Sequence, residues 1–123
     1  NQKIESGAVV NISSIEAIRP AINHSHYAST KAGLLNLTMS SALELGKKNI
    51  RVNSICPGLT ERPGLERDWP EGVKSWLNHV PLGRLCTGDD IANATLFLVS
   101  EASSFITGAC ITVDGGISSV SGW

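Results

Sequence analysis

The sequence predicts an α/β fold with a parallel sheet, of which this chain supplies three strands. Three runs, at residues 7–13, 50–56 and 108–116, are rich in β-branched residues and almost continuously apolar. Such runs are typical of strands that helices cover on both faces. Two stretches between them, at residues 27–48 and 87–100, have helical periodicity. This alternation indicates parallel strands joined by crossover helices.

The composition is that of a globular domain. Of the 123 residues, 41% are hydrophobic and 17% are charged, and the formal net charge is −1. Without a basic stripe, this balance argues against nucleic acid as a partner. No apolar run approaches the roughly 18 residues that cross a bilayer, and the first residues lack the layout of a secretion signal.

The cysteines are Cys56, Cys86 and Cys110. They are widely spaced and form no C-x-x-C pair, so neither a disulfide framework nor a zinc site is expected. We therefore expect a protein of the reducing cytoplasm, without a membrane partner.

The first predicted strand, residues 7–13, begins within a few residues of the start of the sequence. A globular protein can begin this way, and so does the middle of a longer protein whose front half is absent. Three strands make only part of a doubly wound sheet. Because an exposed parallel edge is unstable, we expect missing strands or a tight association.

Residues 15–26 contain Pro20, Asn23 and two histidines and are expected to form a loop. His24 and His26 have no third ligand in view, so solvated loop residues are favoured over a metal site.

The long helix predicted over residues 27–48 has an apolar stripe. Its members recur at steps of four and three: Ala28, Ala32, Leu35, Met39 and Ala42. Leu34, Leu37 and Leu45 broaden the stripe, which favours a helix sandwiched between its own sheet and something else, such as a partner subunit. Gly46 and the two lysines after it are expected to end the helix.

The second predicted strand stops at Pro57-Gly58, and an irregular segment over residues 59–80 follows, with a short helix expected at 71–79. Thr87 and Asp90 have the spacing of a capping box at the start of the last helix. Ile91, Thr95 and Leu98 lie along one face of that helix. The third strand ends in the turn Asp114-Gly115-Gly116.

Tyr27 and Lys31 are four residues apart, which makes them neighbours on one helix face. A free phenol has a pKa of about 10, and a nearby ammonium group favours the phenolate. The pair could therefore serve as a general acid and base. By spacing alone, an incidental pair of surface residues is the more common interpretation.

Ser14 follows the first predicted strand, and Pro57-Gly58 follows the second. Ligands bind beyond the carboxyl ends of the strands in open α/β sheets, and the loop after Ser14 returns the chain to Tyr27. A serine hydroxyl there could donate to a carbonyl oxygen, and Gly58 would let a flat ring approach the backbone. Local capping by Ser13 and Ser14 and a simple turn at Pro57-Gly58 are the alternative interpretations.

Together these segments resemble the short-chain dehydrogenase/reductase family. The resemblance runs in order over nearly the whole chain and rests on four segments: V-V-N-I-S-S at 9–14, Y-A-S-T-K at 27–31, I-R-V-N-S-I-C-P-G at 50–58, and the run from Pro81 to Gly116. It implies the C-terminal portion of a Rossmann-type doubly wound sheet, as a single partial domain over residues 1–123. It also implies hydride transfer between NAD or NADP and an alcohol or carbonyl substrate.

Carried over from the family, Ser14 orients and polarises the substrate oxygen, and Tyr27 exchanges the hydroxyl proton. Lys31 favours ionisation of the tyrosine and also binds the nicotinamide ribose. Pro57 and Gly58 match the turn that lines the nicotinamide. The resemblance also makes the helix over 27–48 a subunit interface, in a homodimer or homotetramer.

Two departures from the family stand out. Members usually carry a threonine five residues after the proline of the turn; here that residue is Arg62, so Thr60 is the candidate cofactor contact. The glycine-rich phosphate-binding turn G-x-x-x-G-x-G, the N-A-G segment and a catalytic asparagine have no counterpart. The choice between NAD and NADP belongs to that absent part of the fold.

Residues 59–80 correspond to the family's variable substrate-binding segment. Trp69 and Trp76 either line a pocket there or fill the segment's own small core. The leading hypothesis is thus an NAD(P)-dependent oxidoreductase seen as its C-terminal half. The alternatives are a truncated or degenerate relative that acts as a non-catalytic interaction module, and a small protein that binds an aromatic or steroid-like ligand.

Overall fold

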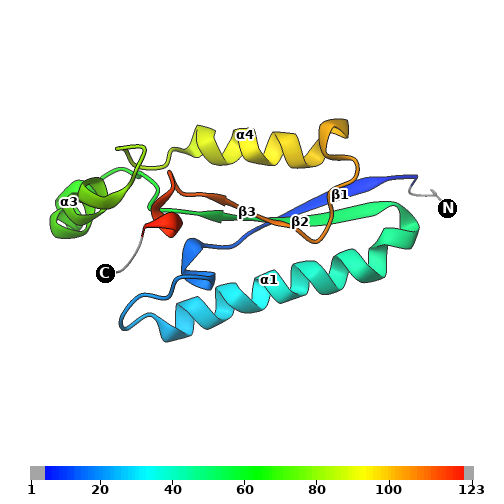
Figure 1. Cartoon of the computed structure of the whole chain (residues 1–123), viewed down its shortest axis with the longest axis horizontal. Helices are drawn as coiled ribbons and strands as arrows, with labels where there is room; N and C mark the ends of the chain where they lie inside the picture. The colour runs from blue at the N-terminus through cyan, green and yellow to red at the C-terminus, as the bar shows by residue number, and fades with distance from the viewer. Residues whose placement is uncertain (1–4, 121–123) are drawn as a thin grey trace.

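The computed structural model describes residues 5–120. Its parallel sheet has the order β1-β2-β3, formed by β1 (Gly7–Ile12), β2 (Ile50–Pro57) and β3 (Cys110–Val113). Helix α1 (Ser25–Leu45) lies on one face of the sheet and α4 (Gly88–Val99) on the other (Figure 1). Helices on both faces of a parallel sheet confirm the predicted α/β class.

The register of the strands brings their carboxyl ends to one edge of the sheet. In β1 and β2, Ile12 pairs with Ile55, and in β2 and β3, Pro57 pairs with Val113. The segments that follow the three strands therefore start close together.

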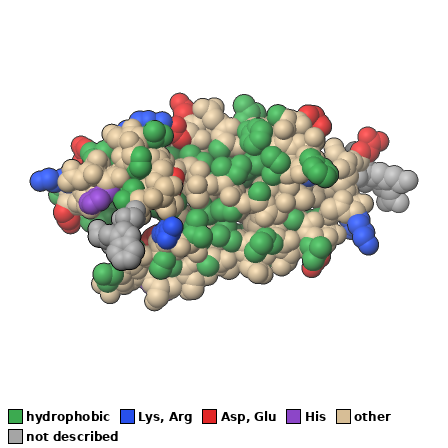
Figure 2. Space-filling model, viewed as in Figure 1, with side chains coloured by type: hydrophobic (Ala, Val, Ile, Leu, Met, Phe, Trp, Pro, Cys, Tyr) green, Lys and Arg blue, Asp and Glu red, His purple; other side chains and the backbone are tan. Residues whose placement is uncertain are grey.

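Only the central strand is buried on both faces as predicted. Ile55 and Cys56 of β2 are 0% exposed. The same prediction is wrong for the outer strands, because Val9 and Ile12 of β1 are both 43% exposed and Cys110 of β3 is exposed. The two helices cover β2 best, so β1 and β3 remain open edges. Figure 2 shows hydrophobic side chains at the surface between α4 and α1, where an edge of the sheet lies.

Helix α1 begins two residues before the predicted start. Ala28 and Ala42 of the predicted stripe are buried, but Met39 is 52% exposed, and Thr38 is buried in its place. The Thr38 hydroxyl donates to Leu34 O at 2.8 Å and accepts from Asn11 Nδ2 at 3.0 Å. These bonds satisfy a buried hydroxyl that an apolar stripe does not predict.

The helix ends at Leu45, and Gly46 keeps right-handed helical angles. A short 3₁₀ turn over Gly46–Lys48 follows, and the left-handed residue that reverses the chain is Asn49, with φ at 57°. Asparagine tolerates this conformation better than most residues.

Residues 59–80 contain the expected short helix as α3 (Pro70–His79) and an unpredicted one, α2 (Leu65–Asp68). Four residues are too few to show a helical period. The predicted glycine turn after β3 is confirmed by the positive φ angles of Gly115 and Gly116, 62° and 91°.

Within residues 5–120, none of the helices is long and apolar enough to cross a bilayer. Location in the cytoplasm stays a prediction.

The predicted capping box at the start of α4 is confirmed. Asp90 N donates to Thr87 Oγ1 at 3.2 Å, and Thr87 N donates to Asp90 Oδ2 at 2.8 Å. Arg84 adds two hydrogen bonds to the same carboxylate, at 2.6 and 3.0 Å. Hydrogen bonds from Arg84 and then from Thr87 hold the pKa of Asp90 well below its ordinary value.

This carboxylate makes part of the stability depend on pH. A carboxyl group whose pKa is lowered in the folded state stabilises the fold above its ordinary pKa of about 4, and this contribution is lost as the pH falls below that value. We expect Asp90→Asn to lower the free energy of unfolding at pH 7, and the difference from the parent to shrink progressively below about pH 4. Urea unfolding at a series of pH values measures this.

Asp89→Asn is the matched control, because Asp89 lies in the same first turn but outside the ion pairs found in residues 5–120. A difference between parent and Asp90→Asn that stayed constant down to acidic pH would contradict the assignment.

Candidate active site at the carboxyl ends of β1 and β2

Ser13 and Ser14, the two residues after β1, have different hydrogen-bond partners. Ser13 N donates to Ile55 O at 2.7 Å, which extends the pairing with β2 by one residue. Ser14 begins the 3₁₀ turn over Ile15–Ala17, and its Oγ accepts from Glu16 N at 3.1 Å. Ser14 is 8% exposed. A hydroxyl that accepts one hydrogen bond keeps its own hydrogen to donate, so local capping does not use up this side chain.

The first turns of α1 are tied to the end of β1 through Lys31. Ser13 Oγ donates to Lys31 O at 2.9 Å, and Lys31 Nζ donates to Ile12 O at 3.3 Å. The same Nζ lies 5.7 Å from the centroid of the Tyr27 ring, within range of a cation–π contact. Tyr27 is 39% exposed. The structure therefore places the Tyr27–Lys31 pair beside the strand end that Ser14 follows.

Two further residues connect Ser14 to Tyr27. Glu16, whose N–H caps Ser14, contacts His24 Nδ1 through Oε1 at 2.8 Å. The His24 ring meets the Tyr27 ring edge-on, with 6.2 Å between centroids. The sequence predicts His24 to be a solvated loop residue and gives no signal for Glu16, because the contact joins residues eight apart in an irregular loop. No cluster of metal-ligating side chains occurs in the part of the chain that the structure describes.

The Pro57-Gly58 turn packs against the segment over residues 59–80. Gly58 N donates to Val113 O at 3.0 Å, so the turn is held to the end of β3. A Cβ on Gly58 would lie 2.6 Å from Trp76 Cη2. Trp76 therefore occupies the space that a side chain at position 58 would need, so only glycine fits there. The Trp76 indole N–H donates to Arg84 O at 3.3 Å.

Thr60 and Arg62 have different local partners. The Thr60 hydroxyl donates to Gly58 O at 3.0 Å and so braces the turn itself. Arg62 pairs with Asp68 at 3.3 Å within the segment over 59–80. A Cβ on Gly72 would lie 2.0 Å from the Trp69 ring. Both tryptophans thus pack on glycines, although Trp69 is still 46% exposed.

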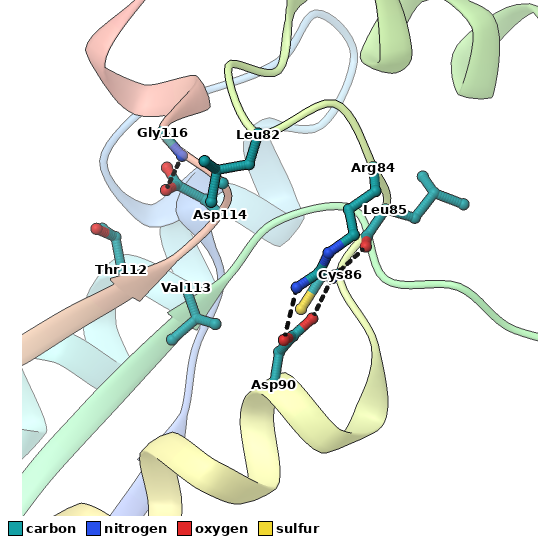
Figure 3. A pocket seen from close by; sticks show the side chains of 10 residues that line it. Leu82, Arg84, Leu85, Cys86, Asp90, Thr112, Val113, Asp114 and Gly116 are labelled. Atoms are coloured by element: carbon teal, nitrogen blue, oxygen red, sulfur yellow. Dashed lines mark hydrogen bonds and ion pairs between the residues drawn. The ribbon is translucent and has the colours of Figure 1, made fainter.

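A cavity of about 320 Å³ lies at the same edge of the sheet, beyond β3. In Figure 3, Asp90 of α4 points toward Arg84, while Thr112 and Val113 approach from β3. Burial opposes ionisation of Asp114, but backbone N–H groups of Gly116 and Ser118 bind its carboxylate at 3.0 Å and help to hold its pKa below the ordinary value. Ser14, Tyr27 and Lys31 do not line this cavity.

Comparison with known proteins assigns the family. Residues 2–118 match the family model of enoyl-(acyl carrier protein) reductase. The 3-oxoacyl-(acyl-carrier-protein) reductase of Chlamydia muridarum is 45% identical over 116 residues, which are 94% of this chain and 46% of that protein. The chain belongs to the short-chain dehydrogenase/reductase family.

Solved structures of this oxidoreductase family have the same Rossmann-type fold. A 7α-hydroxysteroid dehydrogenase complexed with NADH and 7-oxo glycochenodeoxycholic acid superposes with a TM-score of 0.86 at 42% identity, over 91% of this chain and 44% of that one. An Agrobacterium tumefaciens protein named as a 2-deoxy-D-gluconate 3-dehydrogenase, with NADP bound, superposes with a TM-score of 0.87 at 38% identity. The match covers 94% of this chain and 48% of that one. The chain spans about half the length of these dehydrogenase/reductase relatives.

The packing of Trp76 on Gly58 gives a stability prediction. Gly58→Ala should lower the free energy of unfolding by about 1–3 kcal/mol, because the added Cβ overlaps the indole ring. In a Trp76→Phe background the same substitution should cost less, and the difference gives the coupling between the two sites. Chemical unfolding of the four proteins in this double-mutant cycle measures it.

Gly88→Ala serves as the control, since nothing lies within 4 Å of a Cβ there. If Gly58→Ala lowered the free energy of unfolding no more than Gly88→Ala, the inference that Trp76 packs closely on Gly58 would be wrong.

Proposed function

We propose that this chain supplies the proton-transfer group of an NAD(P)-dependent oxidoreductase that interconverts an alcohol and a ketone or aldehyde. The observation that carries the proposal is the position of Lys31 Nζ, which contacts both the Tyr27 ring and Ile12 O at the strand end next to Ser14. A phenol, an ammonium group and a buried hydroxyl at one strand end match the needs of a reacting carbonyl oxygen.

We assign each residue a role in this group. Ser14 donates its hydroxyl hydrogen to the substrate oxygen and so orients it. Tyr27 gives a proton to that oxygen during reduction and takes it back during oxidation. The positive charge of Lys31 stabilises the phenolate that forms when Tyr27 gives up its proton. His24, which contacts Glu16, meets the phenol ring edge-on and limits its positions.

The residues present fit one end of a nicotinamide cofactor. Lys31 Nζ has three donors and uses one on Ile12 O, so two remain for ribose hydroxyls. Pro57 and Gly58 form a turn at the adjacent strand end, with Thr60 bracing it. Bound NAD or NADP would supply the hydride. The sequence has no G-x-x-x-G-x-G turn for the phosphates, so residues outside this chain would have to bind that end.

The test is Tyr27→Phe in the protein that contains this chain. Removal of the phenol hydroxyl should lower kcat with a ketone substrate by about 10²–10⁴-fold, because the proton donor is lost. Binding of NADPH or NADH, followed by fluorescence titration, should change little. Lys31→Met should reduce turnover as well, whereas Lys47→Met, in the 3₁₀ turn beyond the far end of α1, should not.

Substantial turnover by Tyr27→Phe would refute the assignment of the proton donor. The alternative, a non-catalytic interaction module, predicts neither NAD(P)H binding nor turnover in the parent protein. The intact mass of the natural protein and a titration with both cofactors distinguish these two functions.

We further propose that α1 pairs with a second copy in a homodimer or homotetramer. Met39 and Leu43, one turn apart on one face of α1, are 52% and 84% exposed, and Leu37 on a different face is 55% exposed. Large apolar side chains gathered on one helix are typical of an interface.

Leu43→Lys should therefore reduce the molar mass measured by light scattering, because a buried charge would destabilise the interface. Ile22→Lys, at an apolar loop residue that is 89% exposed, is the control. An equal molar mass for Leu43→Lys and the parent would contradict pairing through α1.

A further inference from the structure

Two cysteine thiols from different strands touch each other. The Sγ atoms of Cys56 on β2 and Cys110 on β3 are 2.7 Å apart, although 54 positions separate the residues in sequence. The register pairs Ser54 with Cys110 and Cys56 with Thr112. The two cysteines are therefore one pleat apart on the same face of the sheet.

The two thiols differ in access. Cys110 lies on an edge strand and is exposed, whereas Cys56 is 0% exposed. Burial, followed by the hydrogen bond and the charge interaction with Cys110, raises the pKa of Cys56 to about 12. Cys56 is thus held as a protonated thiol at neutral pH, and a small oxidant reaches Cys110 first.

We propose that Cys56 and Cys110 form a modification site, a dithiol that hydrogen peroxide converts into a disulfide between β2 and β3. The Cys110 thiolate attacks peroxide, so one oxygen joins its sulfur as a sulfenic acid and the other leaves as hydroxide. The Cys56 sulfur then attacks the Cys110 sulfur while the Cys56 thiol proton passes to the hydroxyl group of the sulfenic acid, which leaves as water. Both thiol protons end in water, so two thiols and one peroxide give one disulfide and two waters.

The site does not depend on the proposed oxidoreductase function. Cys56 directly precedes Pro57, so the new bond would fasten the carboxyl end of β2 to β3 next to the Pro57-Gly58 turn. It would also close a long loop and restrict the unfolded chain. The oxidised protein should therefore unfold at a higher temperature than the reduced one.

Cys86 provides a matched comparison within the same chain. It is also buried, and burial raises its pKa as well. Its thiol contacts a backbone oxygen, Thr87 O, at 3.5 Å. Burial alone therefore predicts equal oxidation of Cys56 and Cys86, whereas the proposal predicts that Cys56 joins Cys110 in a disulfide and that Cys86 stays a thiol.

The experiment treats the protein that contains this chain with hydrogen peroxide, alkylates the remaining thiols, and maps peptides by mass spectrometry without reduction. We expect a linked pair of peptides that carry Cys56 and Cys110, lighter by two hydrogens, with Cys86 alkylated. Dithiothreitol should restore both thiols. Cys86→Ser should leave the link intact, and Cys110→Ser should abolish it while Cys56 stays a thiol.

Cys56→Ala should stop the reaction at the sulfenic acid of Cys110, which dimedone captures. Oxidation of Cys56 and Cys86 to the same extent would overturn the proposal. So would conversion of Cys110 to sulfinic acid while Cys56 stays reduced, or a link from Cys110 to a second chain. These outcomes are read from the unaltered protein, so they do not require any variant to fold.

Discussion

The rest of the site depends on the way Ser13 joins three elements. Its N–H donates to Ile55 O in β2, and its hydroxyl donates to Lys31 O in α1. Ser13 is 4% exposed, so both groups need these partners. One residue thus fixes the end of β1 against the central strand and against the first turns of the helix. Tyr27 and Lys31 are positioned by this anchor, since the loop before them is irregular.

A second polar residue, Asn53, holds the other side of the sheet. It is 1% exposed, and its side chain donates to Ile106 O at 2.9 Å and accepts from Ala109 N at 3.0 Å. These bonds fix the segment that leads into β3 alongside β2. Buried polar groups with full partners specify one arrangement of neighbouring segments, so β3 has a defined register although it is only four residues long.

Much of the fold could be predicted because its main signals are local. The capping box of Thr87 and Asp90 and the β-branched run of β2 need no knowledge of distant residues. The burial of Thr38 instead of Met39 could not be predicted in the same way. It depends on Asn11, which lies 27 residues away and supplies the hydrogen bond that a buried hydroxyl needs. The exposure of β1 and β3 likewise depends on which elements pack beside the sheet, and the sequence of one strand does not show this.

In the candidate site, too, local features could be predicted and long-range contacts could not. The spacing of Tyr27 and Lys31 and the strand end at Ser14 were visible in the sequence, because helix period and strand ends fix them. The contact of Glu16 with His24 crosses an irregular loop, where no period relates sequence to space. For Gly58 the sequence leaves two interpretations, the approach of a flat ligand ring and a simple turn, and Trp76 lies where the Cβ of any other residue would be. A glycine after a strand indicates that something approaches closely, and only the packing decides whether that neighbour is a ligand or a side chain of the same chain.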